Sequence, residues 1–367
     1  MKQVKIIEKA LEKFKNINSP KQLLVGFDGF VDEIIHVVDK RQNHDNYERI
    51  KYIETFSERI AQCAGLSANI ELVPIQTKVG GNGPIMANAV MAQGHEVVYI
   101  GALGQTQIDP VFKEVSERFN TVISLTDPGH TDALEFYDGK IMLGKMNNLV
   151  EVSWDKLTEN ISKQEIEKIL SNTELVAFTN WTMLSNLNSI MIEFDNIIKT
   201  LKNKPKVFID LADPKKRTDE DVLEVLKIIS NFESNTVLSM NQNESTIISQ
   251  VLDIKDDDIE SRANKLRQKL DISAIVIHPV KGATISHNKE NRWIDGPYTP
   301  EPKLTTGAGD NFNAGFCNGW INGLEPSEAI AVGVCTSGFY VRNGYSPSKS
   351  ELSKFMAEWI DKNCGEI

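Results

Sequence analysis

Short apolar runs alternate with helical stretches along most of the chain, and this alternation limits the choice of fold more than any other feature. The first apolar run covers residues 22–27, and comparable runs follow at residues 97–100, 175–178, 207–209, 236–239 and 274–277. Strands that are apolar throughout and separated by helices form parallel sheets covered by helices on both faces. We therefore expect an α/β protein of three layers with a mainly parallel central sheet.

The N-terminal segment predicts an amphipathic helix, because Val4, Ile7, Leu11 and Phe14 recur at helical spacing. The segment carries lysines throughout and lacks the apolar core of a signal peptide. No apolar stretch in the sequence is long enough to span a bilayer. We expect a cytoplasmic protein that makes no contact with a membrane.

A hairpin is predicted around Asp138-Gly139, which lies between two short strand-like runs at residues 133–136 and 140–144. An alternating hairpin of this kind fits poorly in a buried parallel sheet. We expect it to belong to a small separate β-sheet that acts as a lid. This lid is predicted to form from inserted segments within about residues 30–79 and 130–150.

Two further elements are predicted in the first of these inserted segments. Residues 39–62 have the polar composition of a helix, with Ile50, Ile53 and Ile60 as its apolar positions, and residues 71–79 form a strand candidate. Because no linker rich in proline, glycine or serine divides the chain, we expect residues 1–367 to form a single large α/β domain.

The charge of the chain excludes one class of partner. With 51 acidic and 40 basic residues the formal net charge is −11, whereas a general nucleic-acid surface needs a basic stripe. Anion binding must therefore be local, through backbone amides and a metal ion. The four cysteines show no paired spacing, so we expect free thiols in a reducing compartment and no structural zinc site.

The segment of residues 305–316, TTGAGDNFNAGF, carries the clearest chemical signal. Two glycines around a small residue allow a tight turn, and the helical stretch that follows places its free amides at a helix N-terminus, where anions bind. Because like charges repel, Asp310 is a poor phosphate ligand but a suitable general base beside a transferring phosphoryl group. The alternative is that Asp310 only caps the helix.

This segment resembles the C-terminal signature of the ribokinase-like (PfkB) carbohydrate kinase family. Three further segments, residues 26–32, 79–83 and 241–244, resemble family motifs and occur in family order, so that the resemblance covers roughly residues 22–345. It implies a ribokinase-like fold and an ATP-dependent phosphotransferase with an alcohol group as acceptor. The acceptor implied is a hydroxyl of a sugar or sugar derivative.

The resemblance also implies roles for the residues of the C-terminal signature. Asp310 takes the proton from the attacking hydroxyl, and backbone amides stabilise the charge on the transferring phosphoryl group. The amides belong to Ala308, Gly309 and Asp310, with Gly307 providing the turn.

The resemblance also implies that two other segments of the chain bind Mg·ATP. Asn241 and Glu244 match an Asn-x-x-Glu motif that organises Mg²⁺, here expected through water, although such residues alone often begin a helix. Residues 278–282, HPVKG, stand where the family has a Thr-Leu-Gly nucleotide loop, and Gly282 is the residue expected to approach ATP. His278 is interpreted as a histidine at the end of a strand rather than as a catalytic group.

The substrate is expected to bind short carboxylate and amide groups that suit a polyol. The candidates are Asp28, Asp32, Gly80, Gly81 and Asn82. The alternatives are that Asp28 is a turn residue and that Asp32 lies on a surface helix.

The sequence departs from the family pattern at two further positions. Ile85 stands where the family commonly has an asparagine, and Asn88 lies one helical turn beyond it. Leu304 replaces an aspartate that helps to form a monovalent-cation site in some members, so activation by potassium stays open.

Two alternatives to a sugar kinase remain on sequence grounds. The same fold serves nucleoside kinases, and a regulator could bind a sugar without turnover. In either case the partner is a small molecule, and family members often form a homodimer through the lid, which would cover exposed strand edges.

Overall fold

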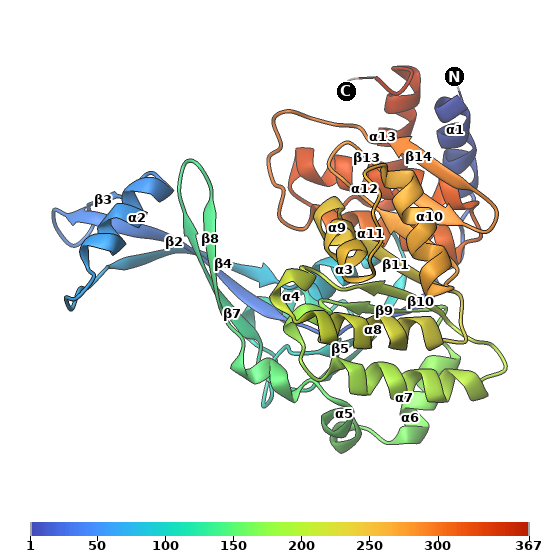
Figure 1. Ribbon diagram of the computed structural model, residues 1–367, viewed down its shortest axis with the longest axis horizontal. Coiled ribbons are helices and arrows are strands. Elements are labelled where there is room, and N and C mark those ends of the chain that lie inside the picture. Colours follow the sequence, from blue (N-terminus) through green and yellow to red (C-terminus); the bar gives the residue numbers. More distant parts are fainter. Residues whose placement is uncertain (1, 366–367) are drawn as a thin grey trace.

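Nine strands form the central sheet of the computed structural model, which describes residues 2–365 (Figure 1). The strand order is β14-β13-β12-β11-β10-β9-β1-β5-β6. All neighbours from β12 to β6 pair in parallel, whereas β13 and β14 are antiparallel. The strands are β1 (Gln22–Gly26), β5 (Glu96–Gly101), β6 (Thr121–Ser124), β9 (Leu175–Thr179), β10 (Lys206–Asp210), β11 (Thr236–Met240), β12 (Ala274–Ile277), β13 (Gly282–His287) and β14 (Asn291–Asp295).

Helices cover both faces of this sheet, so the predicted three-layer α/β fold is confirmed (Figure 1). Successive residues of a strand point to opposite faces, and in β1 Leu23 and Val25 join one core while Leu24 joins the other. On the first side lie α1 (Lys2–Lys15), α3 (Asn82–Ala92), α11 (Ala308–Ile321), α12 (Pro326–Asn343) and α13 (Lys349–Asp361). On the second side lie α5 (Trp154–Asn160), α6 (Lys163–Ser171), α7 (Leu187–Thr200), α8 (Asp219–Asn231), α9 (Gln242–Val251) and α10 (Ile259–Leu270).

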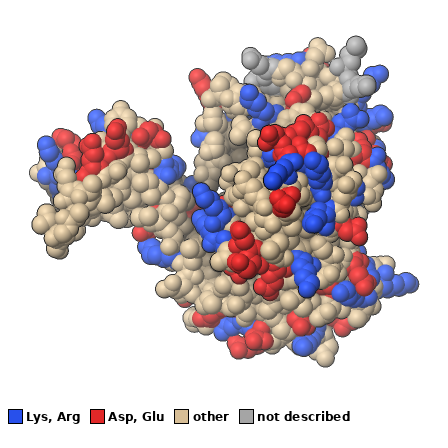
Figure 2. All heavy atoms as spheres, in the orientation of Figure 1, with Lys and Arg blue, Asp and Glu red and all other residues tan. Residues whose placement is uncertain are grey.

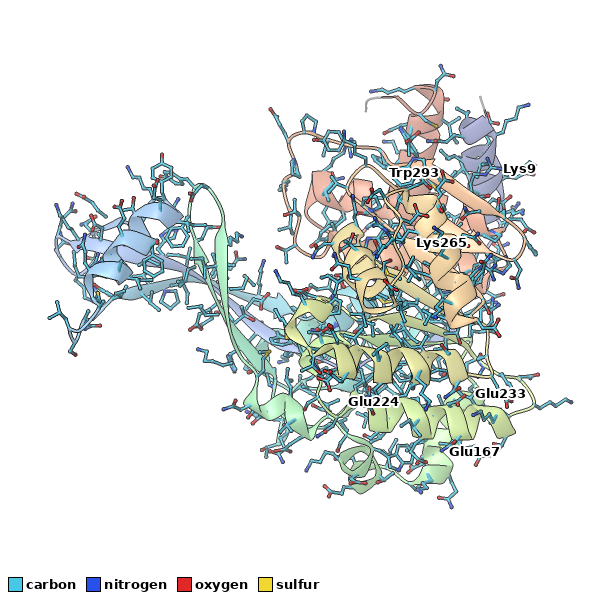
Figure 3. The ribbon with its side chains drawn as sticks, in the orientation of Figure 1. Lys9, Glu167, Glu224, Glu233, Lys265 and Trp293 are labelled. Atoms are coloured by element: carbon cyan, nitrogen blue, oxygen red, sulfur yellow. The ribbon has the colours of Figure 1, made fainter. Side chains whose placement is uncertain are left out.

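The outer surfaces of these helices are charged. Figure 3 shows Lys9 on α1, Glu167 on α6, Glu224 on α8 and Lys265 on α10, all of them exposed. On the face seen in Figure 2, acidic and basic side chains are interspersed. No helix within residues 2–365 is long and apolar enough to cross a membrane.

A second sheet of five strands extends away from the body of the molecule (Figure 1). Its longest strand, β2, pairs in parallel with β7 and in antiparallel orientation with β4. We call this sheet, together with helix α2 (Ile53–Gln62), the arm. Its strands are β2 (Phe30–Arg41), β3 (Tyr47–Arg49), β4 (Leu72–Gly80), β7 (Gly129–Glu135) and β8 (Lys140–Lys145).

The arm has a small hydrophobic core of its own, separate from the two cores of the body. Phe56 of α2 packs there with Ile35 and Val37 of β2 and with Leu134 and Phe136 near the β7–β8 turn. Since a sheet of a few strands needs a covered face to be stable, α2 supports the arm far from the body.

The prediction of one helix over residues 39–62 is wrong. Strand β2 continues to Arg41 and pairs with β3, where Lys40 lies opposite Glu48, and only α2 is helical. The last three residues of β2 are exposed and the three residues of β3 are at most partly buried, so their polar sequence shows no apolar alternation that would distinguish them from a polar helix. The hairpin is confirmed: β7 and β8 are antiparallel and the turn contains Gly139 at φ 158°.

Five short elements complete the chain between the larger ones. They are α4 (Lys113–Ser116) and the 3₁₀ turns η1 (Pro110–Phe112), η2 (Asn147–Glu151), η3 (Trp181–Met183) and η4 (Pro214–Lys216).

Candidate active site

The predicted site residues converge where the carboxyl ends of the parallel strands meet the N-termini of α3, α9 and α11. Asp28 follows β1, Asn241 follows β11, and Asp310 lies in the first turn of α11. In open α/β sheets this edge is where ligands bind. The fold therefore brings together motifs that are far apart in the sequence.

Asp310 is buried and is held by a residue of another predicted motif. The side-chain amide of Asn82 donates a hydrogen bond of 2.9 Å to Oδ1 of Asp310. Burial, followed by the charges of Asp210 and Asp28, raises the pKa of Asp310 well above its usual range. The sequence analysis predicted Asn82 as a substrate ligand. It did not predict this direct contact with Asp310, the candidate general base.

The turn before α11 places its amides differently from the expectation. Gly307 is the N-cap at φ 88°, and the amide of Ala308 donates to the carbonyl of Thr305 at 3.1 Å. The amide of Ala308 is thus used within the turn, and the amides of Gly309 and Asp310 begin the helix. These two amides remain the candidates for binding an anion.

Two side chains pack against this turn, and the sequence analysis did not single out the first of them, Tyr340. The hydroxyl of Tyr340 donates to the carbonyl of Thr306 at 2.8 Å. A Cβ added at Gly307 would lie 2.8 Å from that hydroxyl and 3.1 Å from Cγ2 of Ile85. Ile85, at the position where the family commonly has asparagine, therefore packs against the turn.

Asp28 is fully buried, and both of its oxygens accept hydrogen bonds. Oδ2 accepts from the backbone amide of Asn82 at 2.9 Å and from Nδ2 of Asn180 at 2.6 Å, and Oδ1 accepts from the amide of Gly83 at 2.8 Å. Burial raises its pKa to about 6 despite these donors. The carboxyl of Asp28 thus holds the N-terminus of α3.

Asp32 lies on β2, not on the surface helix that was the alternative, and its side chain covers Gly80. A Cβ added at Gly80 would lie 2.5 Å from the Asp32 carboxyl carbon. Burial raises the pKa of Asp32, while Thr131 and the charge of Lys78 oppose this shift. Gly80 therefore leaves room for a carboxyl at the root of the arm. Gly81 adopts φ +94° directly before α3.

Asn241 and Glu244 form a capping box at the start of α9. The amide of Asn241 donates to Oε2 of Glu244 at 2.7 Å, and its side chain accepts from the amide of Glu244 at 3.0 Å. The helix start weighed as the alternative is therefore present. Within residues 2–365 no three His, Cys, Asp or Glu side chains gather as a metal cluster.

Glu244 nevertheless belongs to an acidic pair. Burial, and then the charge of Asp210, raises the pKa of Glu244 to about 9. Asp210 ends β10 and accepts from Nδ2 of Asn313 at 2.6 Å, and Asn313 in turn accepts from the hydroxyl of Ser239 at 2.8 Å. A divalent cation beside this pair would offset the unfavourable burial of two carboxyls, so the residues fit a metal held mainly through water.

We expect replacement of Glu244 by glutamine to stabilise the protein selectively at high pH. The pKa of Glu244 is raised in the folded state, so its contribution to stability is fully present below its unfolded pKa near 4.5 and is lost as pH rises through about 9. The variant should match wild type near pH 5 and melt about 2 °C or more higher near pH 9. Thermal unfolding at both pH values, with the exposed Glu301→Gln as control, measures this; equal differences at both pH values would contradict it.

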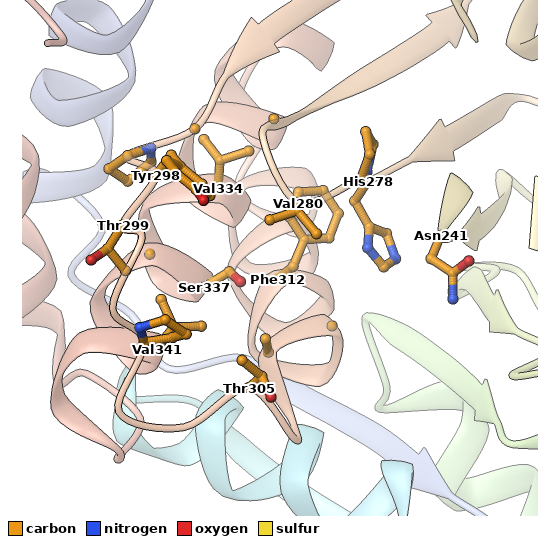
Figure 4. A pocket seen from close by; sticks show the side chains of 18 residues that line it. Asn241, His278, Val280, Tyr298, Thr299, Thr305, Phe312, Val334, Ser337 and Val341 are labelled. Atoms are coloured by element: carbon orange, nitrogen blue, oxygen red, sulfur yellow. The ribbon is translucent and has the colours of Figure 1, made fainter. Parts of the chain in front are cut away.

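A cavity of about 330 Å³ opens beside the start of α11 (Figure 4). Asn241 and His278 lie at one end of the cavity, and Tyr298, Thr299, Val334 and Val341 lie at the other (Figure 4). A cavity with Asn241 and His278 at one end and two valines and a tyrosine at the other suits a ligand with a phosphate chain and an aromatic base.

Gly282 lies in the wall of this cavity, but the fold also requires a glycine at this position. A Cβ there would lie 2.4 Å from the carbonyl oxygen of Ile294, on the neighbouring strand β14. The position is thus compatible with the predicted approach of ATP, while strand packing alone explains the residue.

The residues with contacts at the candidate site that the sequence analysis missed are Asn180, Asp210, Asn313 and Tyr340. Asn180 and Asp210 stand at the ends of the buried strands β9 and β10, a position that itself marks a polar residue at the ligand edge of a parallel sheet. Asn313 and Tyr340 lie inside helices, and nothing local in the sequence distinguishes them.

Comparison with known proteins decides the family. The family model described as prokaryotic ketohexokinase matches residues 2–359. The chain belongs to the prokaryotic ketohexokinase family. It is therefore a carbohydrate kinase, that is, a phosphotransferase. The predicted membership in the ribokinase-like (PfkB) family is confirmed.

A curated relative agrees with membership in this family, and solved structures agree with the fold. A ketohexokinase of Haloferax volcanii is 28% identical over 348 residues, which cover 93% of this chain and 92% of the relative. Arabidopsis thaliana ribokinase, solved with ribose and ATP, has a TM-score of 0.65 at 18% identity, covering 92% of this chain and 99% of that one. An adenosine kinase from Sinorhizobium meliloti has a TM-score of 0.68 at 14% identity, covering 93% and 99%. These two structures show that this chain has the ribokinase-like fold.

Proposed function

We propose that this protein transfers the γ-phosphoryl group of ATP to a hydroxyl group of a ketohexose. The family model and the Haloferax volcanii relative are both named for ketohexokinase. One observation supports the site most strongly. Asp310 lies at the N-terminus of α11, next to Gly309 in the cavity wall, and its carboxyl accepts a hydrogen bond from the side chain of Asn82.

In the proposed reaction Asp310 acts as the general base. Its carboxylate takes the proton of the acceptor hydroxyl as that oxygen bonds to the γ-phosphorus, and the bond from the γ-phosphorus to the β–γ bridging oxygen breaks to release ADP. Since Asn82 occupies Oδ1, we propose that Oδ2 accepts the proton. The amides of Gly309 and Asp310 stabilise the charge on the transferring group.

Mg²⁺ is the proposed metal, held near Asn241 and Glu244 through water. It would supply positive charge that screens the phosphate chain. The raised pKa of Glu244 and its buried neighbour Asp210 support a cation at this place. The protein's own contribution is to hold this acidic pair fixed by the capping box and by Asn313.

We propose that Asp28 holds the N-terminus of α3 in place, while other groups bind the hydroxyls of the sugar. Both Asp28 oxygens are occupied by donors of the chain itself. Oδ1 of Asn180 is buried beside Asp28 and has no hydrogen-bond partner among the described residues. Together with Asp32 it offers an acceptor for a sugar hydroxyl, while Gly80 and Gly81 leave room for the carboxyls of Asp32 and Asp28.

We propose that the arm is the lid of this site and that two copies of the chain associate through it. Strand β2 begins two residues after Asp28 and runs into the arm, so movement of the arm would open or close the site. Ile75 and Leu143 are about half exposed on the arm, at 49% each. Sedimentation of wild type against Leu143→Lys tests the association, which the substitution should weaken.

The function is tested with Mg·ATP and a panel of acceptors: D-fructose and other ketohexoses, aldohexoses, pentoses and nucleosides. We expect ADP release with ketohexoses and at least about tenfold slower release without acceptor, because a closed lid excludes water. Release driven best by nucleosides would favour a nucleoside kinase. Binding without turnover would favour a sugar-binding regulator.

A further inference from the structure

The loop between β12 and β13 places a histidine at the same end of the cavity as Asn241 (Figure 4). The backbone amide of His278 donates to the carbonyl of Met240 at 3.0 Å, which fixes the start of the loop against β11. Its Nε2 atom is buried and has no hydrogen-bond partner among residues 2–365. A buried nitrogen without a partner costs free energy, so its retention calls for a reason.

The orientation of the ring is set by α11. The imidazole stacks on Phe312 with ring centroids 4.6 Å apart and an interplanar angle of 30°. Its Cε1 lies 3.5 Å from the place that a Cβ on Gly309 would occupy. Since Cε1 stands between the two ring nitrogens, the nitrogen-bearing edge faces the first turn of α11. Figure 4 shows the ring between Phe312 and Asn241.

The ring is neutral in the working pH range, because burial lowers the pKa of His278 to about 4. A neutral imidazole carries a single N–H, which makes it a donor at one nitrogen and an acceptor at the other. Beside a helix N-terminus that already favours anions, the partner that such a donor suits is an oxygen of a negatively charged group.

We propose that Nε2 of His278 donates a hydrogen bond to a phosphate oxygen of the bound nucleotide, next to the amide of Gly309. This inference rests on the proposed function, which places a nucleoside triphosphate in the cavity. Val334 and Val341 lie at the end of the cavity that suits the base, whereas His278 lies at the other end with Asn241 (Figure 4). The ring of His278 is also close to Gly309. His278 is thus a residue that recognises phosphate and not the base.

The test compares two ligands that share the base and differ in phosphate. His278→Phe keeps an aromatic ring against Phe312 and removes the donor, whereas His278→Gln keeps an N–H near the position of Nε2. We expect His278→Phe to weaken Mg·ADP about tenfold or more in calorimetry and to leave adenosine within about twofold. His278→Gln should restore ADP binding to within about threefold of wild type.

Val341→Ala serves as the control at the end that suits the base and should weaken ADP and adenosine alike. Equal ADP affinity of His278→Phe and wild type, or an equal loss for adenosine, would overturn the proposal. If wild type itself failed to bind ADP, the proposed nucleotide site would fail instead, so the two failures are distinguishable.

A measurement on the wild-type protein does not depend on any variant folding. Long-range ¹H–¹⁵N correlation spectra at pH 7 report which nitrogen of a histidine carries the proton. The histidine signal that is missing in His278→Phe or His278→Gln assigns His278. We expect a proton on Nε2 in the ADP complex; a proton on Nδ1 alone would overturn the proposal, since Nε2 could not then donate.

Discussion

Replacing Asp310 by asparagine is expected to lower kcat by about 10³-fold, within the range that a positioned general base contributes. The amide has the shape of the carboxyl, and its oxygen still accepts from Nδ2 of Asn82, so the geometry of the site is retained. It has no basic oxygen to take the proton of the acceptor. KM for ATP and for the sugar should stay within about tenfold.

Steady-state and single-turnover rates of Asp310→Asn measure this effect, with the exposed Glu301→Gln as a control that should leave kcat unchanged. Burial raises the pKa of Asp310, so wild-type kcat should rise with pH as the carboxyl loses its proton. That acidic limb should vanish in the variant. A rate within tenfold of wild type would remove Asp310 from the base role.

Gly307→Ala is expected to reduce kcat/KM by about 10²-fold or more, although the change adds one methyl group. Gly307 has φ 88°, a conformation that costs an alanine about 1 kcal/mol, and the new Cβ would lie 2.8 Å from the Tyr340 hydroxyl. Because the Tyr340 hydroxyl is hydrogen-bonded to the carbonyl of Thr306, we expect the turn to shift, and with it the amides of Gly309 and Asp310. A shift of about 1 Å near the reacting groups can cost two orders of magnitude in rate.

A matched control separates backbone strain from the shift of the turn. Gly323 has φ +74° and nothing within 4 Å of an added Cβ, so Gly323→Ala carries the strain without the clash. It should lose similar stability in thermal unfolding and keep wild-type kcat. Adding Tyr340→Phe to Gly307→Ala removes the clashing hydroxyl and should recover part of the rate; equal rates for Gly307→Ala and Gly323→Ala would refute the argument.

The body of the fold could be predicted because its strands are buried on both faces. Leu175–Thr179 and Thr236–Met240 are buried along their whole length, and such strands appear in the sequence as short apolar runs. The arm could be predicted only in part. Its hairpin has a turn signal at Asp138-Gly139. The end of β2 is exposed, β3 is only partly buried, and both are polar, so their pairing is determined by tertiary contacts.

The site could be predicted as a set of motifs but not as a set of contacts. The hydrogen bond from Asn82 to Asp310 joins residues 228 positions apart, and no local pattern predicts it. The sequence proposed Asp28 as a substrate ligand, whereas its oxygens are taken up by donors of α3 and Asn180. Backbone amides are similarly difficult, because the use of the Ala308 amide within the turn depends on the exact path of the chain.

The separate core of the arm has a consequence for the motions that are open to the protein. Phe56, Leu134 and Phe136 hold the arm together without help from the two cores of the body. If the arm moves as the proposed lid, we expect it to keep its internal shape and the bending to be confined to the few residues at its root. Structures of the protein in different ligand states should superpose well as two rigid units and poorly as one.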